Sequence, residues 1–487
     1  MTDFSNLNIN QIKTGLESGK FKAVDIVNFY LDRINLFDSK IKAFITVTKD
    51  TALFQAQKID QKIKDNKPLG KLAGSIMAVK DIYLTKGIQS TSGSQVLKGF
   101  IPQYSSTIYK KLINQDAIII GKTNTDTFAF GASTENSGFF TSHNPWNLDM
   151  VPGGSSGGSA AALSSDFCTF SLGTDTGGSI RQPASLCGVS GIKPTYGLNS
   201  RYGITAMASS FDCPGAFAKN VLDLALITQV TSGFDKHDAT TSQNKPVDYL
   251  DCLDKYSLKG LKIGLPKQYF TKDVDPQVKT QVQKAIDVFI KNGAIVRDIS
   301  LPSTSLGIDV YYVLVPCEIS SNMARYDGLR FGQSVDTDNL IDTYFQTRGK
   351  FMEAELKRRI LIGTYCLSSG YYDAYYLKAA QVRTIIKQEF ASAFKDVDVI
   401  LTPVSPTTAW PIGQKANDPL KMYLADVLTV NVNVAGLPAL SIPCGFDNKN
   451  LPVGFQLIGN YFEEDKLFSL GHQFQQITDF HTYKPKL

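Results

Sequence analysis

Apolar residues recur at two different spacings along the chain, and each spacing predicts a different element. Between 23 and 36 they come every three or four residues, and the same spacing returns between 51 and 65. That period predicts two amphipathic helices. Two short apolar runs, 75–79 and 117–120, have strand-like lengths and flank a helical segment at 109–113. The alternation of strand, helix and strand predicts an α/β fold.

The second half of the chain repeats this alternation. The pattern predicts a helix at 220–231, a strand at 261–265 and an amphipathic helix that begins near Val278 and stops at Gly293. Three later apolar runs are predicted strands, the first two ended by a proline: 397–401, 439–443 and 453–458. Because no repeat or linker interrupts the pattern, we expect one domain over 1–487; a separable C-terminal lobe is the alternative.

Composition narrows the class of protein. The chain has 43% hydrophobic and 20% charged residues and a formal charge of +5, without a basic block that would indicate nucleic acid binding. Seven scattered cysteines without a C-x-x-C pair favour reduced, buried thiols over a disulfide scaffold or a metal site. No apolar run reaches the length of about 18 residues that a membrane helix needs, and the start lacks a signal-peptide pattern. We expect a soluble, unprocessed protein.

Residues 131–215 are rich in Gly, Ser and Thr and poor in charge, which is typical of a loop-rich site or a spacer. Just before them, Gly121-Lys122-Thr123 matches the end of a phosphate-binding loop, but Asp116 stands where that loop needs its first Gly. We interpret this segment as a solvated turn after a strand.

Gly153 to Gly157 match G-x-S-x-G, the turn that presents the serine of α/β-hydrolases. That turn follows a strand, whereas HNPWNLDMVP precedes this one. The mechanism also needs a late histidine, and we interpret His472 and His481 as surface residues near the C-terminus.

A third pattern combines Lys80 after the run SIMAV with PGGSSGGSAA at 152–161 and GTDTGGSIRQPA at 173–184. Amide hydrolysis without histidine needs a serine activated by a base, and a lysine can be that base when burial lowers its pKa. The tetrahedral intermediate needs preorganised N–H donors, which the amides of Thr176, Gly177, Gly178 and Ser179 can supply. Ser179 also heads a possible helix, whose N-terminus favours an anion.

These motifs resemble the amidase signature family, whose signature spans 70–215 here; the helical region 1–66 precedes it, and the likeness continues through 216–487. The intervals of 75 residues from Lys80 to Ser155 and 24 from Ser155 to Ser179 match the family. The resemblance implies a large mixed sheet covered by helices on both faces. It also implies that Lys80 is the base, Ser155 a relay after a cis peptide bond, and Ser179 the acylated nucleophile.

The resemblance implies further roles around this triad. Ser156 and Asp175 are expected to support the relay and its loop, with Ser133 beside them. Segments outside the signature, such as SNMARYDGLRFG at 321–332 and KRRILIGTY at 357–365, resemble the glutamine-hydrolysing subunits of tRNA-dependent amidotransferases. By that likeness Arg359 binds the α-carboxylate of glutamine and Asp426 its α-ammonium, with Tyr311 or Tyr312 beside them. A solvated helix face for Arg358 and Arg359, and a surface position for Asp426, are the alternatives.

One segment departs from that likeness. Such subunits read M-D-E-F-A-M-G where this chain has Thr125 to Gly131 as T-D-T-F-A-F-G, so that a Glu and both Met are lost. We expect the difference to affect how ammonia is handed on rather than the triad.

The resemblance implies a heterotrimer in which the B and C subunits of the amidotransferase complete the enzyme. This chain would bind no cofactor or metal, while ATP and Mg²⁺ act through a partner subunit that also binds the misacylated tRNA. A cytoplasmic location in a bacterium is expected, or mitochondria or plastids in a eukaryote. Two alternatives remain: a stand-alone amidase of small or fatty amides, for which Arg359 and Asp426 would be unnecessary, and a non-catalytic scaffold, which an intact triad disfavours.

Overall fold

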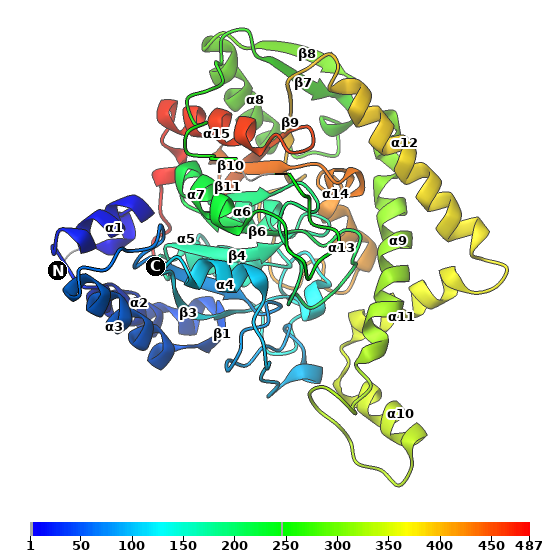
Figure 1. The fold of residues 1–487 in the computed structure, drawn as a ribbon. Coiled ribbons are helices and arrows are strands. Elements are labelled where there is room, and N and C mark those ends of the chain that lie inside the picture. Colours follow the sequence, from blue (N-terminus) through cyan, green and yellow to red (C-terminus); the bar gives the residue numbers. More distant parts are fainter. Residues whose placement is uncertain (1–2, 245–246) are drawn as a thin grey trace.

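In the computed structural model, which describes residues 3–244 and 247–487, eleven strands form one mixed sheet in the order β1-β3-β2-β4-β6-β5-β10-β11-β9-β7-β8 (Figure 1). β2 runs parallel to β3 and β4, β7 runs parallel to β8 and β9, and the other pairs are antiparallel. The strands are β1 (Phe44–Val47), β2 (Ile76–Lys80), β3 (Ile118–Thr123), β4 (Phe170–Thr174), β5 (Ser190–Lys193), β6 (Pro214–Ala218), β7 (Lys262–Pro266), β8 (Ile295–Ile299), β9 (Val399–Pro403), β10 (Ala439–Phe446) and β11 (Pro452–Ile458).

Helices cover both faces of this sheet. They are α1 (Ile9–Glu17), α2 (Ala23–Ile41), α3 (Lys49–Lys64), α4 (Thr107–Ile113), α5 (Gly157–Ser164), α6 (Arg181–Cys187), α7 (Val221–Thr231), α8 (Pro276–Lys291), α9 (Gly307–Asn322), α10 (Leu340–Phe351), α11 (Ala354–Leu367), α12 (Lys378–Ala393), α13 (Pro419–Tyr423), α14 (Val430–Ala435) and α15 (Glu464–Ile477). Side chains of β2 alternate between two hydrophobic clusters: Ile76 and Ala78 pack with α2 and α5, whereas Met77 and Val79 pack in the cluster that contains α4 and α7. The predicted fold class is confirmed.

Most predicted elements are present within a few residues of their expected bounds, but two expectations were wrong. Pro443 does not end its strand, because β10 continues to Phe446 after an irregularity between Pro443 and Gly445. Gly121-Lys122-Thr123 is not a solvated turn; it forms the buried end of β3, where Lys122 pairs with Asp81 at 3.0 Å. A buried strand end cannot wrap around a phosphate as a phosphate-binding loop does.

The outer helices α9 to α12 form a layer beside the sheet, and α10 projects away from the body (Figure 1). The pattern analysis predicted none of them. α9 contains Pro316, and a proline inside a helical pattern usually marks an end. The same helix contacts α11, α12 and α14, so it lacks the single apolar face that periodicity detects.

All seven cysteines lie buried and free within the described residues, as predicted. Among the described helices, none has both the length and the apolar character needed to cross a bilayer.

Candidate active site

Two parallel strands bring the predicted base to the site. β2 and β4 are adjacent, with Val79 opposite Leu172, so their carboxyl ends meet at one edge of the sheet. Lys80 is the last residue of β2, and Thr174 is the last residue of β4. The Lys80 amine therefore reaches the Thr174 hydroxyl, at 3.0 Å.

The Lys80 amine lies among hydroxyl groups and is fully buried. Its Nζ is 2.8 Å from Ser155 Oγ and 2.8 Å from Ser156 Oγ. Burial lowers the pKa of Lys80 to about 7, against the opposing charges of three aspartates, Asp126, Asp175 and Asp212. At neutral pH a large share of this amine is uncharged and able to accept a proton.

Ser155 lies in the irregular segment before α5, and the Gly154–Ser155 peptide bond is cis, as the family resemblance implied. Gly154 is closely surrounded: its N–H donates to Gln182 Oε1 at 3.0 Å, and a Cβ there would lie 2.4 Å from Asp126 Oδ2. Only glycine fits that position. Residues 141–154, all of them described, form no strand directly before Ser155, so the G-x-S-x-G match is not the α/β-hydrolase turn.

Ser179 is adjacent to this pair and more open. Its carbonyl accepts a hydrogen bond from the Ser156 N–H at 3.2 Å, and the residue is 8% exposed, whereas Lys80 and Ser155 are fully buried. Within the described residues, the Ser179 hydroxyl makes no hydrogen bond, so the relay between Ser155 Oγ and Ser179 Oγ stays a prediction. The backbone of Ser179 is thus fixed next to Ser156, which contacts the base, and Ser179 is less enclosed than Lys80 and Ser155, as a nucleophile must be to meet a substrate.

The segment Thr176 to Ser179 presents unused amides. In the part of the chain that the structure describes, these four N–H groups donate to no protein acceptor. Thr429 Oγ1 donates to the Gly177 carbonyl at 2.6 Å, and Thr176 Oγ1 donates to Asp212 at 2.9 Å, so the loop is fixed from two sides. The arrangement can stabilise an oxyanion.

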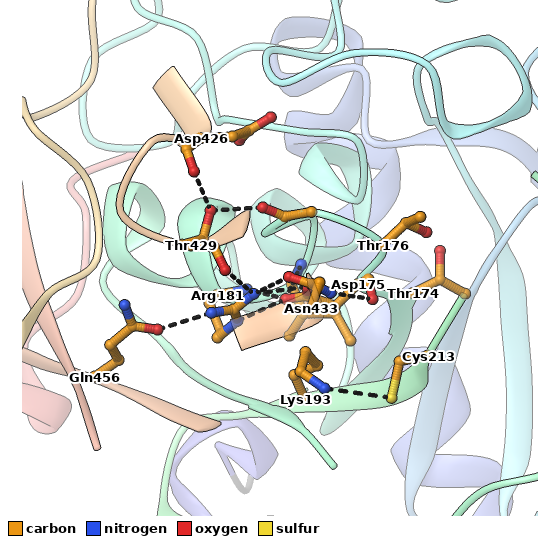
Figure 2. Close-up of polar contacts among 12 residues, drawn as sticks. Thr174, Asp175, Thr176, Arg181, Lys193, Cys213, Asp426, Thr429, Asn433 and Gln456 are labelled. Atoms are coloured by element: carbon orange, nitrogen blue, oxygen red, sulfur yellow. Dashed lines mark hydrogen bonds and ion pairs between the residues drawn. The ribbon is translucent and has the colours of Figure 1, made fainter. Parts of the chain in front are cut away.

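Asp175 holds the start of the Thr176–Ser179 loop in place, as expected of a supporting residue (Figure 2). It pairs with the buried Arg181 at 2.9 Å and accepts the amides of Ile180 and Arg181. Burial would raise the pKa of Asp175, but the Arg181 guanidinium lowers it to about 2. Asn433 and Gln456 contact the Asp175–Arg181 pair and close the network. The carboxylate is therefore ionised and unavailable as a proton acceptor for Lys80.

Arg359 and Asp426 are both buried, at 3% and 7% exposed, so neither is on a solvated face. Arg359 lies on α11, with its guanidinium carbon 5.2 Å from the ring centre of Tyr312. Within the described residues, Asp426 Oδ1 is buried without a hydrogen-bond partner, and burial raises the pKa of this carboxyl well above its usual value although Arg359 opposes the shift. Burial therefore disfavours the ionised form, and a cationic ligand group beside this oxygen would stabilise it.

Tyr311 lies next to the catalytic loop, and Tyr312 lies next to Arg359. The Tyr311 hydroxyl would be 2.7 Å from a Cβ at Gly177, which shows how closely the ring approaches the loop. Burial raises the pKa of both tyrosines, so both hydroxyls stay protonated. The structure thus brings all four predicted substrate residues to one side of the Thr176–Ser179 loop.

Ser133 and Ser156 have different surroundings. Ser156 contacts Lys80 directly and donates to the Thr174 carbonyl at 3.2 Å. Ser133 is buried, with its backbone N 2.5 Å from where a Cβ of Gly154 would lie; its hydroxyl accepts from the Glu135 N–H at 3.4 Å. It lies beside the cis peptide but does not bond to the triad.

Sequence analysis did not identify several residues that contribute to the site. Thr174 and Thr429 have no individual signal, since threonines are common and their partners are set by tertiary contacts. Glu355 had a signal in the sequence, because it precedes Arg359 by four residues, which is the spacing of helix ion pairs. In the structure both residues lie on α11, and their charged atoms are 2.8 Å apart.

The two late histidines lie in another region. His472 belongs to α15 and His481 to the short helix Phe480–Thr482, and both line a cavity with residues of the N-terminal segment such as Asn6. Within the described residues, no group of three or more His, Cys, Asp and Glu is placed to hold a metal ion.

Known proteins resemble this chain over nearly its whole length. The family model described as "Amidase" matches residues 25–468. The A subunit of glutamyl-tRNA(Gln) amidotransferase from Microcystis aeruginosa is 51% identical over 98% of this chain and 99% of that protein, and its counterpart from Carboxydothermus hydrogenoformans is 48% identical over 99% of each. The crystal structure of the corresponding protein from Thermotoga maritima superposes with a TM-score of 0.80 and 39% identity, covering 96% of this chain and 94% of that one. The chain belongs to the amidase family.

Proposed function

We propose that this chain is the glutaminase subunit of a tRNA-dependent amidotransferase, which hydrolyses glutamine to supply ammonia for converting Glu-tRNA(Gln) to Gln-tRNA(Gln). The observation that carries the proposal is that one buried site contains both the Arg359 guanidinium and an Asp426 carboxyl oxygen, Oδ1, that has no protein partner among the described residues. A free amino acid has both complementary charges, and a simple alkyl or aryl amide has neither. The names of the full-length relatives support the same reading.

Catalysis would begin with proton transfer. The neutral Lys80 amine accepts the Ser155 proton across 2.8 Å while Ser155 accepts that of Ser179, whose oxygen attacks the side-chain amide carbon of glutamine. The carbonyl oxygen becomes an oxyanion facing the amides of Thr176 to Ser179.

Collapse of the tetrahedral intermediate breaks the C–N bond. The leaving nitrogen takes the proton back through Ser155 and departs as ammonia, leaving glutamyl-Ser179. Water then attacks the ester with the same groups as base and acid, and releases glutamate with a free Ser179. In acylation the Ser179 proton departs with ammonia, and in deacylation a proton of the attacking water restores the Ser179 hydroxyl, so Lys80 ends each half-reaction neutral.

The remaining work of the enzyme would belong to partner subunits. We assign activation of the misacylated tRNA with ATP and Mg²⁺ to the B subunit, with the C subunit completing a heterotrimer, in the cytoplasm. The segment Thr125 to Thr127 is where we expect the departure from related subunits to affect how ammonia is handed on. Here Thr127 donates to Glu353 at 2.9 Å, so a carboxylate from the start of α11 borders a segment that lacks its own Glu.

The test is ammonia release by the purified chain, with co-purifying partners retained, from glutamine and from alkyl and aryl amides. We expect glutamine to be hydrolysed, with Ser179→Ala reducing the rate to background and stimulation by Glu-tRNA. Rapid hydrolysis of simple amides with no glutaminase activity would instead establish a stand-alone amidase. No hydrolysis of any amide, and no labelling by an acylating probe, would leave the scaffold alternative.

A further inference from the structure

Glu355 lies one helical turn before Arg359 on α11 and contacts three side chains of the predicted substrate pocket. Its Oε1 accepts from Arg359 Nε at 2.8 Å and from the Tyr423 hydroxyl at 3.1 Å. Its Oε2 accepts from Arg358. One carboxylate therefore connects two guanidinium groups and an aromatic ring.

These contacts fix the orientation of the inner guanidinium. The Tyr423 ring stacks on Tyr312 at 3.8 Å, and the Arg359 guanidinium carbon lies 5.4 and 5.2 Å from the two ring centres. Glu355 accepts the hydrogen bond from Arg359 Nε, which leaves the two terminal nitrogens of Arg359 available. Within the described residues, these two nitrogens donate to no protein acceptor. Two parallel N–H donors match a carboxylate.

The backbone that carries Glu355 is itself held in place. Glu353, at the start of the same helix, accepts from Ser94 Oγ at 2.9 Å and from the Gln95 N–H at 2.9 Å. Further along α11, a Cβ at Gly363 would lie 1.9 Å from the Pro316 carbonyl, so α11 approaches α9 as closely as glycine allows. The carboxylate of Glu355 is thus presented from a rigid element.

A cavity of about 280 Å³ opens on the outer side of this cluster, bordered by both guanidinium groups together with Asn136 and Asn417. Since one carboxylate is shared between two guanidinium groups, an excess of positive charge faces the cavity. An anionic substrate group is attracted there before it reaches Arg359.

We propose that Glu355 is the positioning residue that makes the site selective for amides bearing an α-carboxylate. It acts by holding the Arg359 fork and the Tyr423 ring in the geometry that accepts the carboxylate. This inference rests on the proposed glutaminase function and adds the residue that sets its substrate class.

The test compares two substrates on the full chain with its co-purified partners: L-glutamine and 4-aminobutanamide, which is glutamine without its α-carboxylate. In Glu355→Ala, we expect KM for glutamine to rise about tenfold or more with kcat within about twofold, and KM for 4-aminobutanamide to stay unchanged. Glu355→Gln keeps an oxygen acceptor for Arg359 Nε and should recover most of the loss. Tyr423→Phe, which removes only the hydroxyl, should raise KM for glutamine about threefold.

Lys357→Ala is the matched control, because Lys357 is exposed on the same helix and its side chain, among the described residues, bonds only to the Gly349 carbonyl. It should leave both KM values unchanged. Equal rises of KM for the two substrates in Glu355→Ala and Tyr423→Phe, or no rise in either variant, would overturn the positioning role while glutamine hydrolysis by the wild type stands. A wild type that does not hydrolyse glutamine would overturn the proposed function and this inference with it.

Discussion

The uncharged state of Lys80 is the physical condition on which the proposed chemistry depends, and it predicts a particular pH dependence. Burial moves the pKa of this amine from 10.5 to about 7. At about 1.36 kcal/mol per unit, that shift corresponds to roughly 5 kcal/mol. At pH 7 about half of the amine is then neutral, against roughly 0.03% for an unperturbed lysine. Burial therefore raises the population of the base about a thousandfold.

We expect kcat/KM for glutamine to rise about tenfold per pH unit on the acid side of pH 7 and to level off above about pH 8. Lys80→Ala should reduce kcat/KM by about 10²- to 10⁴-fold at every pH. Two neighbouring carboxyls also titrate on the acid side, because burial raises the pKa of both Asp126 and Asp212 to about 6. The decisive range is therefore pH 6.5 to 8.5, measured by ammonia release.

The lowered pKa of Lys80 also predicts how the stability of the folded chain depends on pH, which can be measured without an activity assay. Between about pH 7 and 10.5 the unfolded chain holds a proton on this lysine and the folded chain does not, so stability increases with pH across that window. The wild type should gain about 1.4 kcal/mol per pH unit relative to Lys80→Met, measured from urea denaturation at pH 7.5 and 8.5. Parallel stability slopes for the two proteins, together with an activity profile that is flat from pH 6.5 to 8.5, would refute a neutral lysine base.

Two further substitutions test the loop that faces the substrate. Arg181→Met leaves Asp175 buried without its counterion and should lower the free energy of unfolding by about 3–5 kcal/mol, measured by urea denaturation; a loss below about 1 kcal/mol would contradict the assigned role of the pair. Gly178 has a φ of +140°, and a Cβ there would lie 2.2 Å from Thr429 Oγ1. Gly178→Ala should therefore displace the adjacent amides and reduce kcat by about 10²- to 10³-fold, with KM for glutamine little changed. Wild-type turnover in that variant would show that the amides do not stabilise the oxyanion.

The strands and the amphipathic helices that position the site could be predicted because each has a simple period. The apolar run before Lys80 and the helix from Pro276 to Lys291 are examples. The helix α9 could not be predicted, because it is buried on several sides and contains Pro316. That helix supplies Tyr311 and Tyr312, and the equally unpredicted α11 supplies Arg359, so pattern analysis alone placed three of the four predicted substrate residues on no expected element.

Some residues of the site could be identified from the sequence and others could not. Lys80, Ser155 and Ser179 were identified because their spacing matches a family motif. Thr429 was not, because it contacts the Gly177 carbonyl across 252 positions of sequence, and no local pattern encodes such a contact. Long-range hydrogen bonds of this kind depend on how β10 and α14 return to the catalytic edge of the sheet.

Two buried lysines in neighbouring strands show that burial alone does not make a base. Lys122 is as inaccessible as Lys80, and burial lowers the pKa of both, but Asp81 lies 3.0 Å from Lys122 and opposes the shift. Among the described residues, the Lys80 amine hydrogen-bonds only to hydroxyls, although Asp81 follows it directly in sequence. The nearby carboxylates are engaged elsewhere: Asp175 binds Arg181, and Asp126 accepts backbone amides. We infer that burial keeps the Lys80 amine neutral because Asp81, Asp126 and Asp175 are directed to other partners.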